Sequence, residues 1–206
     1  MRASAELTAG SDEDLFARVR GGDEAAFAVL VRRYERELYG YLHRYLGDAS
    51  LADDVFQNTF LQVHVKRDSY EPGRPFRPWL YAIATNQAID MLRRRRRHAA
   101  VSLDNQPNDA ADGNSGQLLE LLEHRGPSPV DAVSQDERRK RVRDAVDRLP
   151  DFLKQVVLLA YFQGLPYRDV AEALHIPVGT VKSRLNSALH RLHEAWSEDS
   201  GSPASD

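Results

Sequence analysis

The sequence predicts an all-α protein of two small helical domains joined by a flexible acidic linker. Apolar residues recur at steps of three and four along most of the chain, which is the period of an amphipathic helix. No segment shows the strict alternation of a strand, and no repeat of fixed period is present. A stretch between residues 103 and 134, rich in Asp, Asn, Gly, Ser and Pro, separates the two helical parts.

The charges divide the chain at the same places. We expect a disordered N-terminal tail over residues 1–13, a first domain over 14–98, a linker over 99–133, a second domain over 134–196 and a tail over 197–206. The first domain has 15 Lys and Arg against 11 Asp and Glu, the linker has 1 against 6, and the second domain has 11 against 8. Two basic domains therefore flank an acidic connector, which the net charge of -3 conceals.

Composition excludes several classes of protein. The chain has no cysteine, so it has no disulfide, thiolate metal site or cysteine nucleophile. The longest apolar run, residues 156–162, is too short to cross a membrane, and residues 1–14 lack the apolar stretch of a secretory signal. We expect a cytoplasmic protein with no membrane insertion, no metal site and no cofactor.

The first domain is expected to contain a bundle of helices. The first long helix has a continuous apolar face and is interrupted at Gly47 and Asp48. That face consists of Phe27, Leu30, Val31, Tyr34, Leu38, Tyr41, Leu42 and Tyr45. A second helix turns Val55, Phe56, Phe60 and Val63 inward. Residues 68–78, with three prolines and Gly73, are expected to form a loop, and a third helix runs from about Pro78 to Arg97.

The second domain shows the pattern of a helix-turn-helix. Its expected helices are 136–149, 150–162, 165–174 and about 180–196. Gly164 is expected to end the second of these, and Thr180 to be the N-cap of the last. The apolar positions that match a helix-turn-helix core are Val170, Ala171, Leu174, Ile176, Val178, Val181 and Leu185.

Polar residues gather on the opposite face of the last helix. Ser183, Asn186, Ser187 and His190 share that face, and Lys182 and Arg184 flank it. Small hydrogen-bonding side chains suit base edges and cations suit phosphates, so this helix fits the major groove of DNA. The alternative is an amphipathic bundle helix with a solvated face.

A second polar stripe is expected on the helix 78–97. Trp79, Asn86, Asp90, Arg93 and Arg97 fall on one outward side of a helical wheel. An indole can stack on an unpaired base, an amide can read its edge, and arginines can bind the neighbouring phosphates. The alternative is that Trp79 is a core residue and the arginines are a solvated run.

A third polar surface lies on the helix before the loop. Asp53, Asp54, Gln57, Asn58 and Gln62 stand opposite the apolar side of that helix. Adjacent carboxylates diverge by about 100° on a helix, so Asp53 and Asp54 are poor joint metal ligands. The surface is either a protein-docking face or a solvated face with acids placed favourably toward the helix dipole.

Together these segments resemble the extracytoplasmic-function (ECF) sigma factors of the sigma-70 family. Residues 51–60 are similar to the family's core-polymerase-binding helix, 76–94 to its minus-ten recognition and melting helix, and 165–185 to its minus-thirty-five helix-turn-helix. The resemblance implies that residues 14–98 are sigma region 2 and residues 134–196 are region 4. It implies a non-enzymatic protein whose partners are core RNA polymerase, through its β′ clamp helices and β flap, and promoter DNA. An anti-sigma factor is a further candidate partner.

The resemblance also implies roles for individual residues. Those facing the polymerase would be Asp53, Asp54, Gln57 and Asn58. The loop 68–78 and Asn86 would capture a flipped promoter base. The residues on minus-ten DNA would be Trp79, Asn86, Asp90, Arg93, Arg94 and Arg97. Those on minus-thirty-five DNA would be Arg168, Thr180, Lys182, Ser183, Arg184 and Ser187.

Two residues depart from the family pattern. Pro166 stands where the family usually has Ser or Thr, and His175 where it usually has Gly. We expect Pro166 at the start of its helix and His175 in a left-handed conformation, which His tolerates better than most residues. These departures concern the helix entry and the turn rather than the fold.

Two other functions compete with this interpretation. A stand-alone helix-turn-helix regulator could have a similar second domain, but the helical, basic N-terminal half is unlike an α/β receiver domain. A DNA-processing enzyme is disfavoured because His190 and His193 have no metal-type companion, and neither a Gly-rich phosphate loop nor a Ser-His-Asp set can be nominated.

Overall fold

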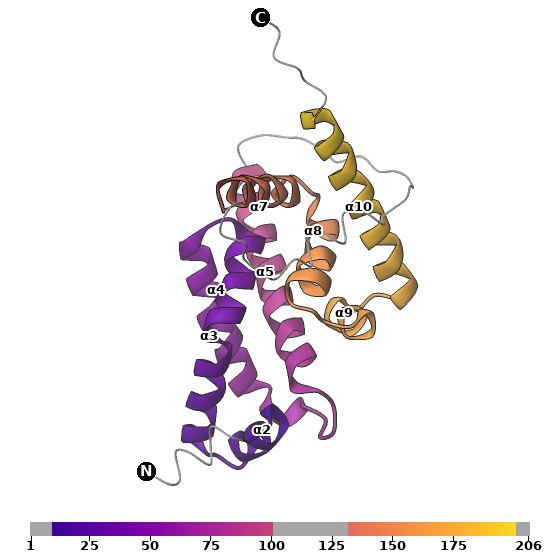
Figure 1. The fold of residues 1–206 in the computed structure, drawn as a ribbon. Helices are drawn as coiled ribbons and strands as arrows, with labels where there is room; N and C mark the ends of the chain where they lie inside the picture. The colour runs from indigo at the N-terminus through magenta and orange to yellow at the C-terminus, as the bar shows by residue number, and fades with distance from the viewer. Residues whose placement is uncertain (1–9, 101–131, 201–206) are drawn as a thin grey trace, which may run out of the picture. The chain divides into compact units, whose positions relative to one another are not determined.

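The structure, a computed structural model, describes residues 10–100 and 132–200, with side chains described for residues 10–97 and 140–196. Throughout these ranges the regular elements are helices, which confirms the all-α prediction (Figure 1). The chain divides into two compact units, of which the first holds α2 to α5 and the second nearly all of α7 to α10. The predicted linker 99–133 lies almost wholly outside the described residues.

The first unit is a helical bundle. It consists of α2 (Asp12–Arg20), α3 (Glu24–Leu46), α4 (Ala49–Val65) and α5 (Phe76–Ala100), with a short 3₁₀ turn, Arg67–Ser69, after α4. Helices α3, α4 and α5 pack against one another, and α2 packs against α3 and α5 (Figure 1). The largest fully buried side chains of this unit are aromatic: Phe16, Tyr41, Phe76 and Tyr81.

Side-chain caps explain where these helices begin. The Ser11 hydroxyl accepts the Asp14 N–H at 3.1 Å, so α2 begins at Asp12 and the predicted tail 1–13 was too long. The Asp23 carboxylate accepts the Ala26 N–H at 3.0 Å, which lowers the pKa of that carboxyl. Asp48 caps α4, and Gly47, with φ of 69°, ends α3 in the left-handed conformation.

The third predicted helix starts earlier than expected. Helix α5 begins at Phe76, two residues before Pro78. Pro78 therefore stands in the first turn, where its missing N–H costs no intrahelical hydrogen bond.

The second unit packs α10 (Val178–Ser200) against α7 (Ala132–Asp147) and α8 (Asp151–Val157). Helix α9 (Tyr167–Leu174) precedes α10. The predicted helix 150–162 is not uniform, because its last turn, Leu158–Phe162, is a π-helix. The Gln163 N–H bonds to the carbonyl of Leu158 at 3.0 Å, five residues back, and Gly164 then ends the element at φ of 63°.

The predicted helix-turn-helix is present. Two details of the prediction were wrong, and one is confirmed. Thr180 is not an N-cap, because α10 begins at Val178 and the Pro177 carbonyl already accepts the Val181 N–H at 3.1 Å. Val178 is not a core residue, because it stands 39% exposed at the helix start, whereas Ala173 is fully buried. His175 adopts the predicted left-handed conformation, with φ of 53°.

A membrane-spanning helix is not found in the described ranges, where none of the helices is long and apolar enough.

Candidate nucleic-acid interface

The outer face of α5 carries the predicted polar stripe, except at its start. Asn86 and Asp90 are exposed, as are all five arginines from Arg93 to Arg97. Asp90 and Arg93 form only a loose ion pair at 3.9 Å, with both side chains more than half exposed. An amide, a carboxylate and cations are therefore available together to a ligand.

Trp79 does not belong to this exposed stripe. It is half-buried, and its ring lies 5.2 Å from Phe16, 5.1 Å from Tyr70 and 5.9 Å from Phe76 between centroids. The structure supports the alternative in which Trp79 is mainly a packing residue. The helical wheel placed it outward because a wheel cannot show that α2 covers this side of the start of α5.

Contacts with α3 set the rotation of α5. The hydroxyls of Tyr41 and Thr85 lie 2.8 Å apart in the interior. One turn earlier, Tyr81 donates to the Glu37 carboxylate at 2.6 Å, and burial raises the pKa of Tyr81. With Thr85 directed inward, the next residue, Asn86, is directed to solvent.

The arginines at the end of α5 differ in their ion pairs. Arg95 reaches back to Asp48, the N-cap of α4, at 3.5 Å. Arg94 and Arg97 have no ion pair to any residue that the structure describes. These two cations are therefore the better placed to bind phosphates.

The loop before α5 is compact and exposed at its tip. Residues 71–75 are exposed, and Gly73 has φ of 90°, which glycine adopts without strain. The Tyr70 hydroxyl donates to the Arg74 carbonyl across the loop, and Arg74 pairs with Glu71 at 2.7 Å. The tip is thus held by contacts within the loop itself.

The predicted docking face of α4 is exposed and extends further than expected. Asp53, Asp54, Gln57 and Asn58 all face solvent. Leu61 and Val65, 57% and 62% exposed, continue the line of Asp54 and Asn58 at helical spacing. The signal that could have found them is that both are large apolar residues that the inward set left unassigned.

The residues assigned to the α9 and α10 surface differ in how exposed they are. Arg168 on α9 and Lys182 and Ser183 on α10 are exposed, whereas Thr180 and Ser187 are half-buried. Arg184 is also half-buried, and its guanidinium lies 5.5 Å from the ring centre of Phe152 on α8. Phe152, an exposed aromatic residue, was missed as a partner for Arg184 because the two are far apart in sequence.

Comparisons with known proteins agree with this arrangement. The family descriptions "Sigma-70 region 2" and "Sigma-70, region 4" match residues 30–98 and 139–192. The RNA polymerase sigma-H factor of Pseudomonas aeruginosa is 34% identical over 189 residues, which cover 92% of this chain and 95% of that protein. The chain belongs to the ECF class of the sigma-70 family. The ECF sigma factor SigW of Bacillus subtilis is also 34% identical to this sigma factor, over 86% of this chain and 90% of that protein.

Solved structures show the same fold. CnrH, in complex with the cytosolic domain of CnrY, has a TM-score of 0.64 at 22% identity, over 92% of this sigma factor and 99% of that chain. RpoE of Bartonella quintana, in complex with the anti-sigma factor NepR, has a TM-score of 0.57 at 23% identity, over 79% and 91%.

The family assignment decides between the functions left open by the sequence. The region 2 match, over residues 30–98, covers most of the N-terminal helical unit, which a stand-alone helix-turn-helix regulator would not have. This chain is an RNA polymerase sigma factor, and sigma factors are initiation factors rather than enzymes.

Proposed function

We propose that this sigma factor binds core RNA polymerase through α4, captures the opened minus-ten element with the loop 71–75 and α5, and reads the minus-thirty-five element with α10. The observation that carries the proposal is the α5 face, where exposed Asn86 stands between the loop and two arginines, Arg94 and Arg97, available for phosphate. An amide that can read a base edge, followed by cations for the backbone, suits a single strand leaving a duplex.

The α4 surface is the proposed polymerase-binding face. Its acidic and amide residues, Asp53, Asp54, Gln57 and Asn58, suit polar contacts with the β′ clamp helices. Exposed Leu61 and Val65 on the same helix would add apolar area, as the centre of a protein interface usually requires. The β flap is the proposed partner of region 4.

Strand opening needs more than the sigma factor alone. Extruding a base costs a few kcal/mol, and stacking it on an aromatic ring returns about 1–3 kcal/mol. Because Trp79 is engaged with its neighbours, the captured base would depend more on hydrogen bonds from the loop and Asn86. Polymerase contacts must therefore supply the remaining free energy.

Region 4 is proposed to position rather than to open the promoter. Lys182 and Ser183 on α10 and Arg168 on α9 are exposed for phosphates and base edges. Thr180, Arg184 and Ser187 are only partly accessible, so their contacts would be made at the edges of the groove.

The two units act through linkage. Core polymerase would hold both units on one duplex, so that their separate weak affinities combine. The free protein should bind promoters weakly, and nanomolar specific binding without polymerase would count against the proposal.

Since core polymerase works in the bacterial cytoplasm, the proposal places this sigma factor there. The complex of RpoE with NepR suggests an anti-sigma factor as a further candidate partner of this chain.

The direct test mixes the protein with core polymerase and genomic DNA and maps the transcript starts. The expected result is a set of starts that share a pair of upstream elements and are absent with core polymerase alone. No new starts would refute the proposal.

A second test separates opening from polymerase binding. Asn86→Ala should impair open-complex formation, measured by permanganate footprinting, more than core binding, measured by pull-down. Asn58→Ala is the matched control, because it removes an exposed amide from α4 and should show the opposite pattern. Equal losses in both assays for Asn86→Ala would contradict its assigned role.

A further inference from the structure

Helix α2 lies outside the part of the chain that matches region 2, which begins at residue 30, yet it contacts the start of α5. We infer that α2 is a brace for the base-capturing loop and that Glu13 and Phe16 are positioning residues for promoter opening. This inference rests on the proposed function of the loop 71–75 and α5.

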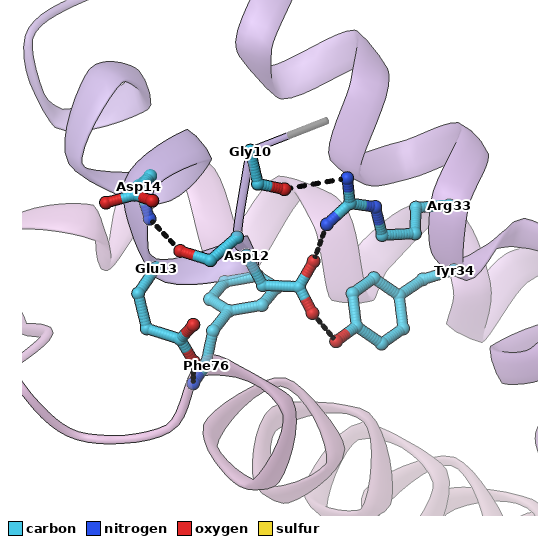
Figure 2. A network of polar contacts seen from close by, with 8 residues as sticks. Gly10, Asp12, Glu13, Asp14, Arg33, Tyr34 and Phe76 are labelled. Atoms are coloured by element: carbon cyan, nitrogen blue, oxygen red, sulfur yellow. Dashed lines mark hydrogen bonds and ion pairs between the residues drawn. The ribbon is translucent and has the colours of Figure 1, made fainter. Parts of the chain in front are cut away.

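Glu13 holds the first residue of α5. Its carboxylate Oε1 accepts the backbone N–H of Phe76 at 2.8 Å, from a position 63 residues away in sequence (Figure 2). The first N–H groups of a helix have no partner within the helix, and a negative charge is favoured at that end. Because the residues before Phe76 form the loop tip, this bond fixes the point where the loop ends.

Phe16 holds both ends of the loop. It is fully buried, and its ring centre lies 4.9 Å from that of Tyr70 and 4.8 Å from that of Phe76. Tyr70 immediately precedes the exposed residues 71–75, and Phe76 immediately follows them. The same ring contacts Trp79, so the loop ends and the first turn of α5 share one aromatic cluster.

The other side of α2 is fixed to α3. Asp12 accepts hydrogen bonds from Arg33 and from the Tyr34 hydroxyl, and Arg33 also donates to the Gly10 carbonyl at 3.0 Å (Figure 2). Helix α2 therefore connects the loop to the long helix of the bundle. A loop whose two ends are fixed before the DNA arrives loses less conformational freedom when a base enters it.

At Glu13, loss of the negative charge and loss of the hydrogen bond should change DNA binding in opposite directions. Removing a carboxylate near DNA should by itself strengthen DNA binding, because it reduces repulsion of the phosphates. Weaker binding after Glu13→Ala would therefore point to the lost hydrogen bond. Glu13→Gln also removes the charge but keeps an oxygen that can accept the Phe76 N–H.

The test uses complete holoenzyme and a single-stranded oligonucleotide with the non-template minus-ten sequence of a promoter mapped for the wild-type protein. We expect Glu13→Ala to weaken binding of this strand by about tenfold, the order expected for one charge-assisted hydrogen bond. The strand affinity of Glu13→Gln should stay within about threefold of wild type, because this variant keeps a hydrogen bond to the Phe76 N–H. A small loss is expected, since a neutral hydrogen bond is weaker than a charge-assisted one. Asp14→Ala, which removes an exposed acid from the same turn, is the matched control and should not weaken binding.

Two further measurements separate positioning from folding. Core-polymerase binding should be unchanged in all three variants, and hydrogen exchange of the Phe76 amide should speed up only in Glu13→Ala. Phe16→Leu, which keeps the buried apolar volume but loses the ring contacts, should weaken strand binding in the same direction.

The inference would be overturned if Glu13→Ala bound the strand like wild type, or lost core binding to the same extent as strand binding. Failure of the Gln variant to restore binding would also overturn it. If wild-type holoenzyme bound the strand no better than core polymerase alone, the proposed function would fail first.

Discussion

The hydroxyl oxygens of Tyr41 and Thr85 lie 2.8 Å apart, with both side chains buried between α3 and α5. This contact sets the rotation of α5 at the position directly before Asn86. A buried hydrogen bond thus determines which side of the helix faces solvent.

Loss of one partner of this pair should destabilise the first unit. Thr85→Val keeps the shape but leaves the Tyr41 hydroxyl without its partner, so we expect a loss of about 1–3 kcal/mol in the free energy of unfolding. The double variant Tyr41→Phe/Thr85→Val should lose less than the sum of the two single variants. Urea unfolding measures all three.

Thr59→Val is the matched control for that cycle. Thr59 is also buried, but its hydroxyl donates to the Val55 carbonyl within the same helix at 2.7 Å. Its removal orphans no distant group and should cost less than Thr85→Val. Additive effects of Tyr41→Phe and Thr85→Val would show that the two hydroxyls are not coupled.

Alkaline pH should destabilise the first unit. Burial raises the pKa of Tyr34, Tyr41 and Tyr81, whereas an unfolded tyrosine ionises near pH 10. The folded state therefore keeps protons that the unfolded state releases, so this stability is present below about pH 10 and is lost as the pH rises above it. Melting temperatures between about pH 8 and 11 should fall, and Tyr41→Phe should make the fall less steep. An identical pH profile for that variant would argue against the assignment to Tyr41.

Trp79 should contribute to stability before it contributes to DNA binding. Trp79→Ala removes contacts with Phe16, Tyr70 and Phe76. Because the side chain is only half-buried, we expect a loss of about 2 kcal/mol, below the usual range for a fully buried Trp. Trp79→Phe should retain most of the stability that Trp79→Ala loses. Unchanged urea unfolding of Trp79→Ala would instead favour a role restricted to stacking on a base.

The arginines at the end of α5 should differ in their effect on DNA binding. Arg97→Ala should weaken holoenzyme binding to promoter DNA and reduce the slope of log affinity against log salt by about one, because one phosphate contact is lost. Arg95→Ala should change the slope less, since Arg95 is already paired with Asp48. Binding measured over a series of salt concentrations distinguishes them, and equal slopes for the two variants would contradict the distinction.

The helices themselves were predictable from local patterns. The stops at Gly47 and Gly164 depend on residues close in sequence, and the structure confirms them. It also buries most of the apolar positions expected on α3 and α4, but Phe27, Val31 and Phe56 are only half-buried. The left-handed His175 was expected because it stands where the family usually has Gly, and the structure confirms it. By contrast, the start of α10 was misplaced, because the Pro177 carbonyl supplied the first helical bond and no side-chain cap at Thr180 was needed.

What the sequence by itself determined is the set of helices and most of their apolar faces, which follow from spacing along one helix, and the segments that resemble a sigma factor, which follow from the residues that they contain. Only the tertiary structure decided which polar residues are free to act. Trp79 and Arg184 were each expected on the DNA side of their helix, and each proved to contact a residue distant in sequence. The physical reason is that a helical period shows which direction a side chain takes, but not which distant residue already occupies that space.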